Sequence, residues 1–208
     1  MQGPSETSNA ESIMALDEAQ LIQILKDPQK PLFAKAKACQ RLAVAGTKQA
    51  VPALATLLAD PQVAHYARFG LEPIPDPSVD AALRDALKKL KGKLQIGVIQ
   101  SISNRRDTKA VKPLAQLLNA SGEGVAEAAA QALGRIASPG AARELQKALA
   151  RGKPQVKAAV AHAALVCAEG LAAQGKSGEA RALYQALSQA GVPKPVQAAA
   201  KRRLNLDS

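Results

Sequence analysis

The stretch that decides the fold is VAEAAAQALGRIASPGAARELQKAL, residues 125–149. Its apolar residues recur every three to four positions on both sides of Ser138-Pro139-Gly140, which is a turn signal. The pattern predicts two short helices joined by a tight turn. Each helix has an apolar stripe that it cannot bury alone, so the hairpin needs neighbours of the same kind.

The same hairpin recurs along the chain. Equivalent leucines in four second helices are separated by 29, 31 and 31 residues; they are Leu54, Leu83, Leu114 and Leu145. The preceding first helices, in residues 38–46, 98–106 and 129–137, align without gaps. A period of about 30 residues is typical of stacked helix–turn–helix repeats. We therefore expect an all-α fold, a right-handed α-solenoid of about five to six hairpins.

The segment AAAQALGRIASPGAARELQKAL, residues 128–149, resembles the HEAT-like repeats of bacterial proteins, the short form also found in phycobilisome-lyase-type repeat proteins. The resemblance covers residues 30–150 and implies an armadillo-like array whose first helices line a concave face. It says little about chemistry, because HEAT-like families include scaffolds, pigment lyases, DNA-repair glycosylases and a metal-dependent hydroxylase. AEGLAAQGKSGEARALYQAL, residues 168–187, resembles a tetratricopeptide-repeat helix pair.

Three parts follow from these patterns. Residues 1–13 are polar and expected to be disordered. Residues 14–153 hold the HEAT-like repeats, and residues 154–208 hold longer, tetratricopeptide-like helices packed on the same array. Local signals place Asp17 at the start of a helix, Gly46 at the end of another, and Ser78 as the cap of the helix that ends at Leu90.

Composition and charge restrict the partners. The net charge of +11 favours an acidic protein, a nucleic acid or another polyanion, although solvated lysines explain it equally well. The densest basic cluster is Arg84, Lys88, Lys89, Lys91 and Lys93, and a second one lies at residues 201–203. No apolar run approaches the ~20 residues of a membrane span, and the first residues lack a signal-peptide pattern. The compartment stays open, either the cytoplasm or export with the signal removed.

The sequence contains no catalytic constellation. His65 and His162 are the only histidines, and no closely spaced Cys/His set, phosphate-binding glycine loop or nucleophile elbow is present. Cys39 and Cys167 lie in different repeats and are expected to be buried thiols. We expect no metal, no cofactor and no enzymatic activity, with a small-molecule lyase as the remaining enzymatic alternative.

Aligning the first helices gives two columns of side chains on the expected concave groove. One column holds Gln40, Phe69, Gln100 and Gln131, and the next holds Asn104 and Arg135. Repeated glutamines suit hydrogen bonding to an extended peptide or polymer, but they are also common on a solvated face.

A second cluster is expected where neighbouring first helices meet. His65, Tyr66, Arg68 and Glu72 would lie near Arg105, Arg106 and Asp107. These groups could bind a carboxylate or phosphate through guanidinium. They could equally form a structural ion-pair network, with Asp107 as a helix N-cap or turn residue. The candidate binding residues are Gln40, His65, Tyr66, Arg68, Phe69, Gln100, Asn104, Arg105, Arg106, Gln131 and Arg135.

These patterns favour a non-catalytic protein–protein interaction scaffold that binds an acidic or extended partner in the groove. The alternative is a module that binds the nucleic-acid backbone with its basic surface. The identity of the partner, the oligomeric state and the extent of the repeat array stay open.

Overall fold

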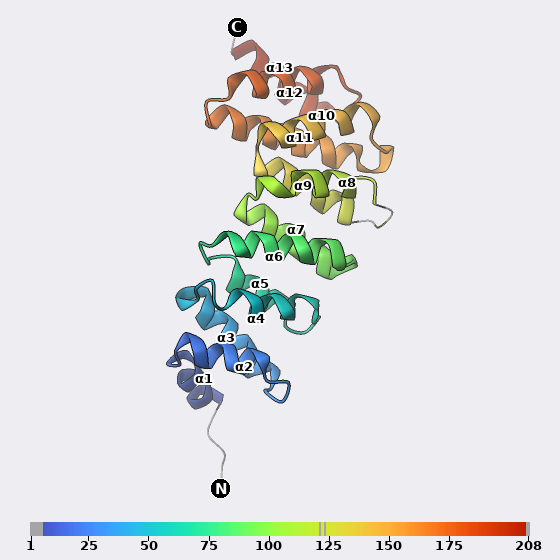
Figure 1. Cartoon of the computed structure of the whole chain (residues 1–208). Coiled ribbons are helices and arrows are strands. Elements are labelled where there is room, and N and C mark those ends of the chain that lie inside the picture. Colours follow the sequence, from blue (N-terminus) through green and yellow to red (C-terminus); the bar gives the residue numbers. More distant parts are fainter. Residues whose placement is uncertain (1–5, 121, 123, 207–208) are drawn as a thin grey trace. The chain divides into compact units, whose positions relative to one another are not determined.

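The computed structural model describes residues 6–120, 122 and 124–206. Within that part of the chain it has thirteen α-helices, three short 3-10 helices and no β-strand (Figure 1). The predicted all-α solenoid of helical hairpins is confirmed. The chain divides into two compact units, Met1–Ser101 and Ile102–Ser208, and the division falls inside one helix, α7 (Gly92–Arg105).

The first unit stacks its helices in two layers. Its elements are α1 (Glu6–Met14), α2 (Glu18–Lys26), α3 (Leu32–Ala45), α4 (Val51–Thr56), η1 (Leu57–Ala59), α5 (Ala64–Leu71), α6 (Pro77–Lys89) and the larger part of α7. One layer is formed by α2, α4 and α6, which contact one another in that order. In the other layer α3 packs on α5. The first helices of the predicted hairpins therefore lie together, apart from the second helices.

The second unit repeats this arrangement. Its elements are the end of α7, η2 (Thr108–Ala110), α8 (Val111–Leu117), α9 (Val125–Ile136), α10 (Pro139–Arg151), η3 (Pro154–Val156), α11 (Lys157–Ala173), α12 (Ser177–Gln189) and α13 (Lys194–Leu206). The second helices α8, α10 and α12 form one layer, and α9 packs on α11 in the other. The last helix, α13, packs on α12 and α11.

The apolar stripes that predicted the repeat form the core. All four leucines that defined the period, Leu54, Leu83, Leu114 and Leu145, are fully buried. Alanine supplies much of the remaining core, which keeps the helical layers thin and closely spaced. Each hairpin thus buries one side against its neighbours and leaves the other side exposed.

Local capping signals explain most helix ends. Asp17 caps α2, because its carboxylate accepts a hydrogen bond of 2.8 Å from the backbone N–H of Gln20. Gly46 follows the last residue of α3, as predicted. Asp107 accepts a hydrogen bond of 2.9 Å from the backbone N–H of Lys109, which confirms it as an N-cap.

The cap of α6 differs from the prediction. Asp76, not Ser78, is the N-cap, and its Oδ1 accepts a hydrogen bond of 2.9 Å from the backbone N–H of Ser78. The reason is the proline between them: its fixed φ suits the first helical position, so the helix begins at Pro77 and Ser78 already lies inside it.

Two further differences concern the ends of the chain. Disorder was expected over residues 1–13, but Glu6–Met14 forms α1, which packs on α3; residues 1–5 lie outside the described part. Pro154–Ala173, with 20 residues and a mean hydropathy of 1.5, is long and apolar enough to cross a membrane by length and composition alone. The expectation that no apolar run approaches this length is therefore wrong. In the structure α11 packs against α9, α10 and α12.

Small residues allow α9 and α11 to approach closely. A Cβ added at Gly134 would lie 2.8 Å from the carbonyl oxygen of Ala163 and 3.1 Å from its Cα. Because these atoms are backbone, neither can move aside without shifting a helix. Gly134 therefore sets the distance between the two helices, as its position among alanines in the first helix suggests.

We expect Gly134→Ala to lower the free energy of unfolding by about 1–3 kcal/mol, despite the better helix propensity of alanine, because the added methyl overpacks the interface. Gly178→Ala is the matched control, since a Cβ at Gly178 meets nothing within 4 Å. It should leave the stability unchanged or raise it by up to about 1 kcal/mol. Urea denaturation of both variants measures the difference, and an equal effect at the two sites would contradict the role of Gly134.

The two cysteines are free and buried, which confirms the prediction of structural thiols. Burial raises the pKa of Cys39 to about 12 and that of Cys167 to about 12. Neither thiol is therefore an activated nucleophile, because the thiolate is the reactive form.

We expect iodoacetamide at pH 8 to leave both cysteines unmodified in the native protein and to modify both in urea, as read by intact mass. The raised pKa values also make the native state less stable above pH 9, since an unfolded thiol loses its proton there while the buried thiol keeps it until about pH 12. Rapid modification of the native protein would show that the thiols are accessible.

Candidate functional site

The exposed side of α3 and α5 holds most of the aromatic residues of this chain. Of the four aromatic residues, Phe33, Tyr66 and Phe69 lie on these two helices, whereas Tyr184 is buried in the second unit. Phe69 is 56% exposed and Phe33 is 37% exposed. The fold does not need these side chains for its core, so their exposure calls for a functional explanation.

We name this surface the α3–α5 face. On α3 its residues are spaced by four, three and four positions, which places them on one side of the helix. Its members are Phe33, Lys37, Gln40 and Val44 from α3, and His65, Tyr66, Arg68, Phe69 and Glu72 from α5 and its C-cap.

A pocket of about 350 Å³ lies on the α3–α5 face. It is lined by Gln40 from α3 and by His65, Tyr66, Arg68, Phe69 and Glu72. Five of the eleven candidate binding residues therefore surround one cavity. Their role in binding stays a prediction. The sequence placed Gln40 and Phe69 in one column and the other three in a separate cluster, and the structure brings the two sets together around one pocket.

Contacts between neighbouring side chains order the rim of the pocket. Lys37 Nζ donates a hydrogen bond of 3.1 Å to Gln40 Oε1 and lies 5.8 Å from the centroid of the Phe33 ring. The rings of His65 and Tyr66 lie side by side, with centroids 3.7 Å apart and planes tilted by 39°. These contacts restrict rotamers before any ligand arrives, which lowers the entropy lost on binding.

The charged wall of the pocket is held by α7. A Cβ at Gly97 would overlap the guanidinium group of Arg68, so that group lies directly against the α7 backbone. Ser101 Oγ donates a hydrogen bond of 2.6 Å to Glu72 Oε1. In both pairs the α7 residue lies 29 positions after its partner on α5, about one repeat further along the chain.

Arg68 is a partly desolvated cation. Burial lowers the pKa of Arg68 below its ordinary value, and the negative charge of Glu72 opposes that shift. Arginine stays protonated in proteins, so the wall keeps its positive charge. Among the described residues, none forms a hydrogen bond with the Arg68 guanidinium, whereas the Glu72 carboxylate is held by Ser101.

The other candidate residues lie on α7 and α9. Gln100 is exposed on the part of α7 that belongs to the first unit, and Asn104 is exposed on the part that belongs to the second. Gln131 and Arg135 are exposed one turn apart on α9. The two columns of the alignment thus consist of exposed or partly exposed side chains.

Arg105 and Arg106 follow each other at the end of α7 in different environments. Arg105 is half-buried, and Arg106 is exposed with a left-handed φ of 52°. The predicted cluster of Arg105, Arg106 and Asp107 with His65 and Tyr66 draws on both units, and it stays a prediction.

Sequence reasoning missed Phe33, Lys37 and Val44. The signal was present, since these residues share one side of α3 with Gln40. The aligned core of the first helix begins at residue 38, however, so Phe33 and Lys37 fell outside the comparison. Gly97 and Ser101 were missed because their role depends on which side chains lie opposite them.

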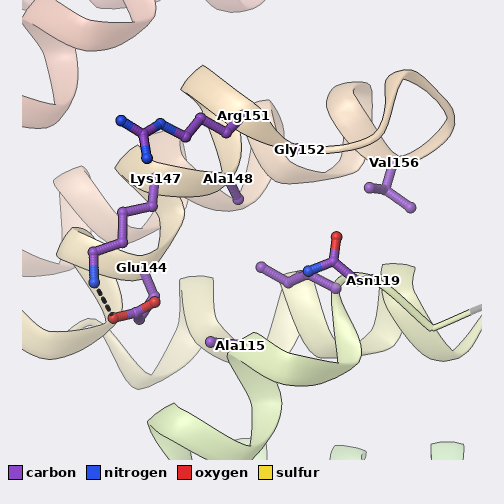
Figure 2. A pocket seen from close by; sticks show the side chains of 9 residues that line it. Ala115, Asn119, Glu144, Lys147, Ala148, Arg151, Gly152 and Val156 are labelled. Atoms are coloured by element: carbon purple, nitrogen blue, oxygen red, sulfur yellow. Dashed lines mark hydrogen bonds and ion pairs between the residues drawn. The ribbon is translucent and has the colours of Figure 1, made fainter.

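A second pocket, of about 230 Å³, lies on the second helices of the other unit (Figure 2). Ala115, Leu118 and Asn119 line it from α8 and the following turn, with residues of α10 opposite. Lys147 on this wall donates a hydrogen bond of 2.8 Å to Glu144 (Figure 2). Its lysine charge is already compensated, and no aromatic residue lines it, so it is the weaker candidate.

In the described part of the chain, no group of three His, Cys, Asp or Glu residues lies close enough to hold an ion.

Comparisons with known proteins identify the fold. No curated protein matches this chain in sequence. Among solved structures, the chain is similar to a designed armadillo repeat protein in complex with the peptide (KR)4, with a TM-score of 0.55, 19% identity, and coverage of 93% of this chain and 100% of that chain. It is also similar to an engineered protein, Northeast Structural Genomics Consortium Target OR329, with a TM-score of 0.52, 20% identity, and coverage of 89% and 95%. The complex of CpcE and CpcF of phycocyanin lyase from Nostoc sp. PCC7120 has a TM-score of 0.48, 18% identity, and coverage of 100% and 85%.

The family comparison agrees with the structural ones. Residues 79–165 match the family model for HEAT repeats, which confirms the resemblance in that segment. Residues 79–165 are therefore similar to HEAT repeats, and the chain has an all-α solenoid fold like that of the designed armadillo repeat protein.

Proposed function

We propose that this protein is a non-catalytic interaction module that holds an extended segment of a partner protein on the exposed side of its first helices. The α3–α5 face carries this proposal, because it concentrates three of the four aromatic residues of the chain on two neighbouring helices whose buried sides are rich in alanine. Solenoid repeats of this kind typically serve as extended binding surfaces.

The composition of the face suits a protein partner. Aromatic side chains are enriched in the buried centres of interfaces, where they add a large contact area for a small loss of conformational entropy. Phe33 and Phe69 are the exposed aromatic anchors here. Val44, 79% exposed, extends the apolar surface along α3.

The polar columns suit an extended backbone. A carboxamide offers two N–H donors and a carbonyl acceptor, so it can pair with both the C=O and the N–H groups of a strand that has no partner of its own. Gln40 and Gln100 provide this chemistry in the first unit, and Gln131 provides it in the second. The designed armadillo repeat protein with a similar fold is in complex with a peptide, which supports a peptide as the kind of ligand proposed here.

Charge favours an acidic segment. The chain carries a net charge of +11, and Lys37 and Arg68 bring two positive charges to the α3–α5 face. The peptide bound by the designed armadillo repeat protein, (KR)4, is basic. The partner that we propose for this chain is acidic and therefore differs from that peptide in charge. The positive charge of this chain accelerates its association with an acidic partner and disfavours the binding of basic partners.

None of these observations favours the nucleic-acid alternative. The densest basic cluster, from Arg84 to Lys93, lies on α6, in the following turn and at the start of α7, and none of its residues lines the pocket of the α3–α5 face. Within it Lys88 pairs with Asp85 at 3.2 Å, and both side chains are largely exposed.

The test is affinity capture from an extract of the source organism with the wild-type protein, a Phe33→Ser/Phe69→Ser variant and a control. The double variant removes the two exposed aromatic anchors without touching the core, so it should fold normally and lose its partner by about tenfold or more. Arg143→Ala on the exposed side of α10 is the control and should capture the partner normally. Quantitative mass spectrometry measures the recovery.

Equal recovery by the wild-type protein and the double variant would contradict the proposal. An Arg105→Glu/Arg106→Glu variant extends the test to the second predicted cluster. If its recovery is unchanged, those arginines are structural and the binding surface does not include them.

A further inference from the structure

We propose that the pocket of the α3–α5 face is a carboxylate subsite. It binds the side chain of one acidic residue of the partner together with an adjacent apolar side chain. This inference rests on the proposed function and narrows it to a site and a ligand chemistry. Arg68 holds the carboxylate, Gln40 donates a second hydrogen bond, and Tyr66 with Phe69 contacts the apolar side chain.

Arg68 has the properties of a preorganised anion receptor. Its guanidinium lies against the backbone of Gly97, which fixes its position on the pocket wall. It is half-buried, and a partly desolvated cation interacts more strongly with an anion than a solvated one does. The planar guanidinium matches a carboxylate with two parallel hydrogen bonds, a geometry that lysine cannot reproduce.

The nearby acid does not neutralise this cation by a direct hydrogen bond. Ser101 donates to Oε1 of Glu72, and the effect of Glu72 on Arg68 is a Coulombic attraction. Lys37 and Arg68 thus place two positive charges at the pocket and its rim, with the carboxylate of Glu72 beside them. These two cations favour a carboxylate ligand. A doubly charged phosphate placed beside Glu72 is repelled more strongly, so an acidic side chain is favoured over a phosphorylated one.

Gln40 supplies the second donor. Its Oε1 accepts the hydrogen bond from Lys37, which leaves the Nε2 group to donate to a ligand. Both Gln40 and Arg68 line the same cavity, so a carboxylate between them receives hydrogen bonds from α3 and α5 together.

The aromatic wall selects the neighbouring side chain. Phe69 is 56% exposed, and Tyr66 is held in place by the ring of His65. A cavity of about 350 Å³ has room for one acidic and one apolar side chain, and an apolar group there covers the aromatic rings that the folded chain leaves in water. The preferred sequence is therefore an acidic residue next to, or two residues from, a leucine or phenylalanine.

Gly97 gives a test that keeps every charge. The three atoms nearest to a Cβ at Gly97 all belong to the guanidinium of Arg68, which is the far end of a flexible side chain, so we expect Gly97→Ala to displace that group and not the backbone. Alanine is also the better helix former, so the unfolding midpoint should stay the same or rise. Because this variant keeps Arg68, a loss of binding would show that the position of the guanidinium group matters for binding.

The experiment has two stages. A library of random twelve-residue peptides is selected for binding to the full-length wild-type protein. Enriched peptides are then synthesised with amidated C-termini, both as selected and with every Asp and Glu replaced by Asn and Gln. Fluorescence anisotropy measures their affinity for the wild-type protein and for Arg68→Ala, Arg68→Lys, Gly97→Ala and the control Arg143→Ala.

We expect enriched peptides to carry Asp or Glu beside an apolar residue and to bind the wild-type protein at least ~tenfold more tightly than their amide counterparts. Arg68→Ala and Gly97→Ala should abolish that preference, Arg68→Lys should retain part of it, and Arg143→Ala should retain all of it. Amidated termini ensure that the carboxylate comes from a side chain. A preference confined to peptides with a free C-terminus would overturn the side-chain assignment.

The outcomes separate the two proposals. If no peptide is enriched, both the interaction module and the carboxylate subsite are wrong. If peptides bind but do not distinguish carboxylates from amides, or keep the preference without Arg68, the interaction module stands and the subsite is wrong. Enrichment of phosphorylated over acidic peptides in a parallel selection would also overturn the charge argument.

Discussion

The fold depends on burying short helices that have only one apolar stripe. No single hairpin has a core of its own, so each leucine of the repeat is buried by residues of neighbouring helices. Glycine and alanine bring the backbones close, most tightly where Gly134 meets the backbone of Ala163. Stacking buries only one side of each helix. The side chains on the opposite side are not needed for the core, so they can vary to suit a binding partner.

Polar contacts between residues one repeat apart also fix how neighbouring helices align with each other along their lengths. In the first unit Glu18 accepts hydrogen bonds from the backbone N–H and the hydroxyl of Thr47, at 2.6 and 3.0 Å, across 29 positions. Glu72 and Ser101 are joined across the same interval, and the guanidinium of Arg68 meets Gly97 across it as well. The candidate pocket therefore uses the same spacing that holds the repeats together. Its charged wall is set by the register of α5 and α7, which is why a glycine in α7 matters to an arginine in α5.

Periodicity predicted the repeat well because it depends on many residues at once. The leucine period, the capping of α2 by Asp17 and the end of α3 at Gly46 all follow from local rules, and the structure confirms them. The misplaced cap at Ser78 shows the limit of those rules, since Asp76 and Ser78 are both good caps and the proline between them decides. The helix Glu6–Met14 has a polar sequence, and its contact with α3 could not be foreseen from composition.

The candidate site was predicted only in part, because an alignment of repeats does not show which side chains contact one another. A column of aligned residues gives the side of a helix that a residue occupies, so Gln40 and Phe69 were found. It does not give the contacts between columns, such as the bond from Lys37 to Gln40 or the bond from Ser101 to Glu72. The role of Gly97 could not be predicted from the sequence. Gly97 matters because it has no side chain at the point where the guanidinium of Arg68 contacts α7, and that contact is visible only in the structure.

The exposed side of α9 in the second unit differs in chemistry from the α3–α5 face of the first unit. In the second unit α9 exposes Glu127, Gln131 and Arg135, which are polar and close to electrically neutral as a set. In the first unit the corresponding side exposes two phenylalanines and carries an arginine without a hydrogen-bonding partner among the described residues. Both surfaces are built on the same repeat, so the fold alone does not require this difference. Exposed aromatic residues also carry a risk of aggregation, and a soluble repeat gains nothing from them unless a ligand covers them. The asymmetry therefore supports the proposal that recognition is concentrated on the α3–α5 face.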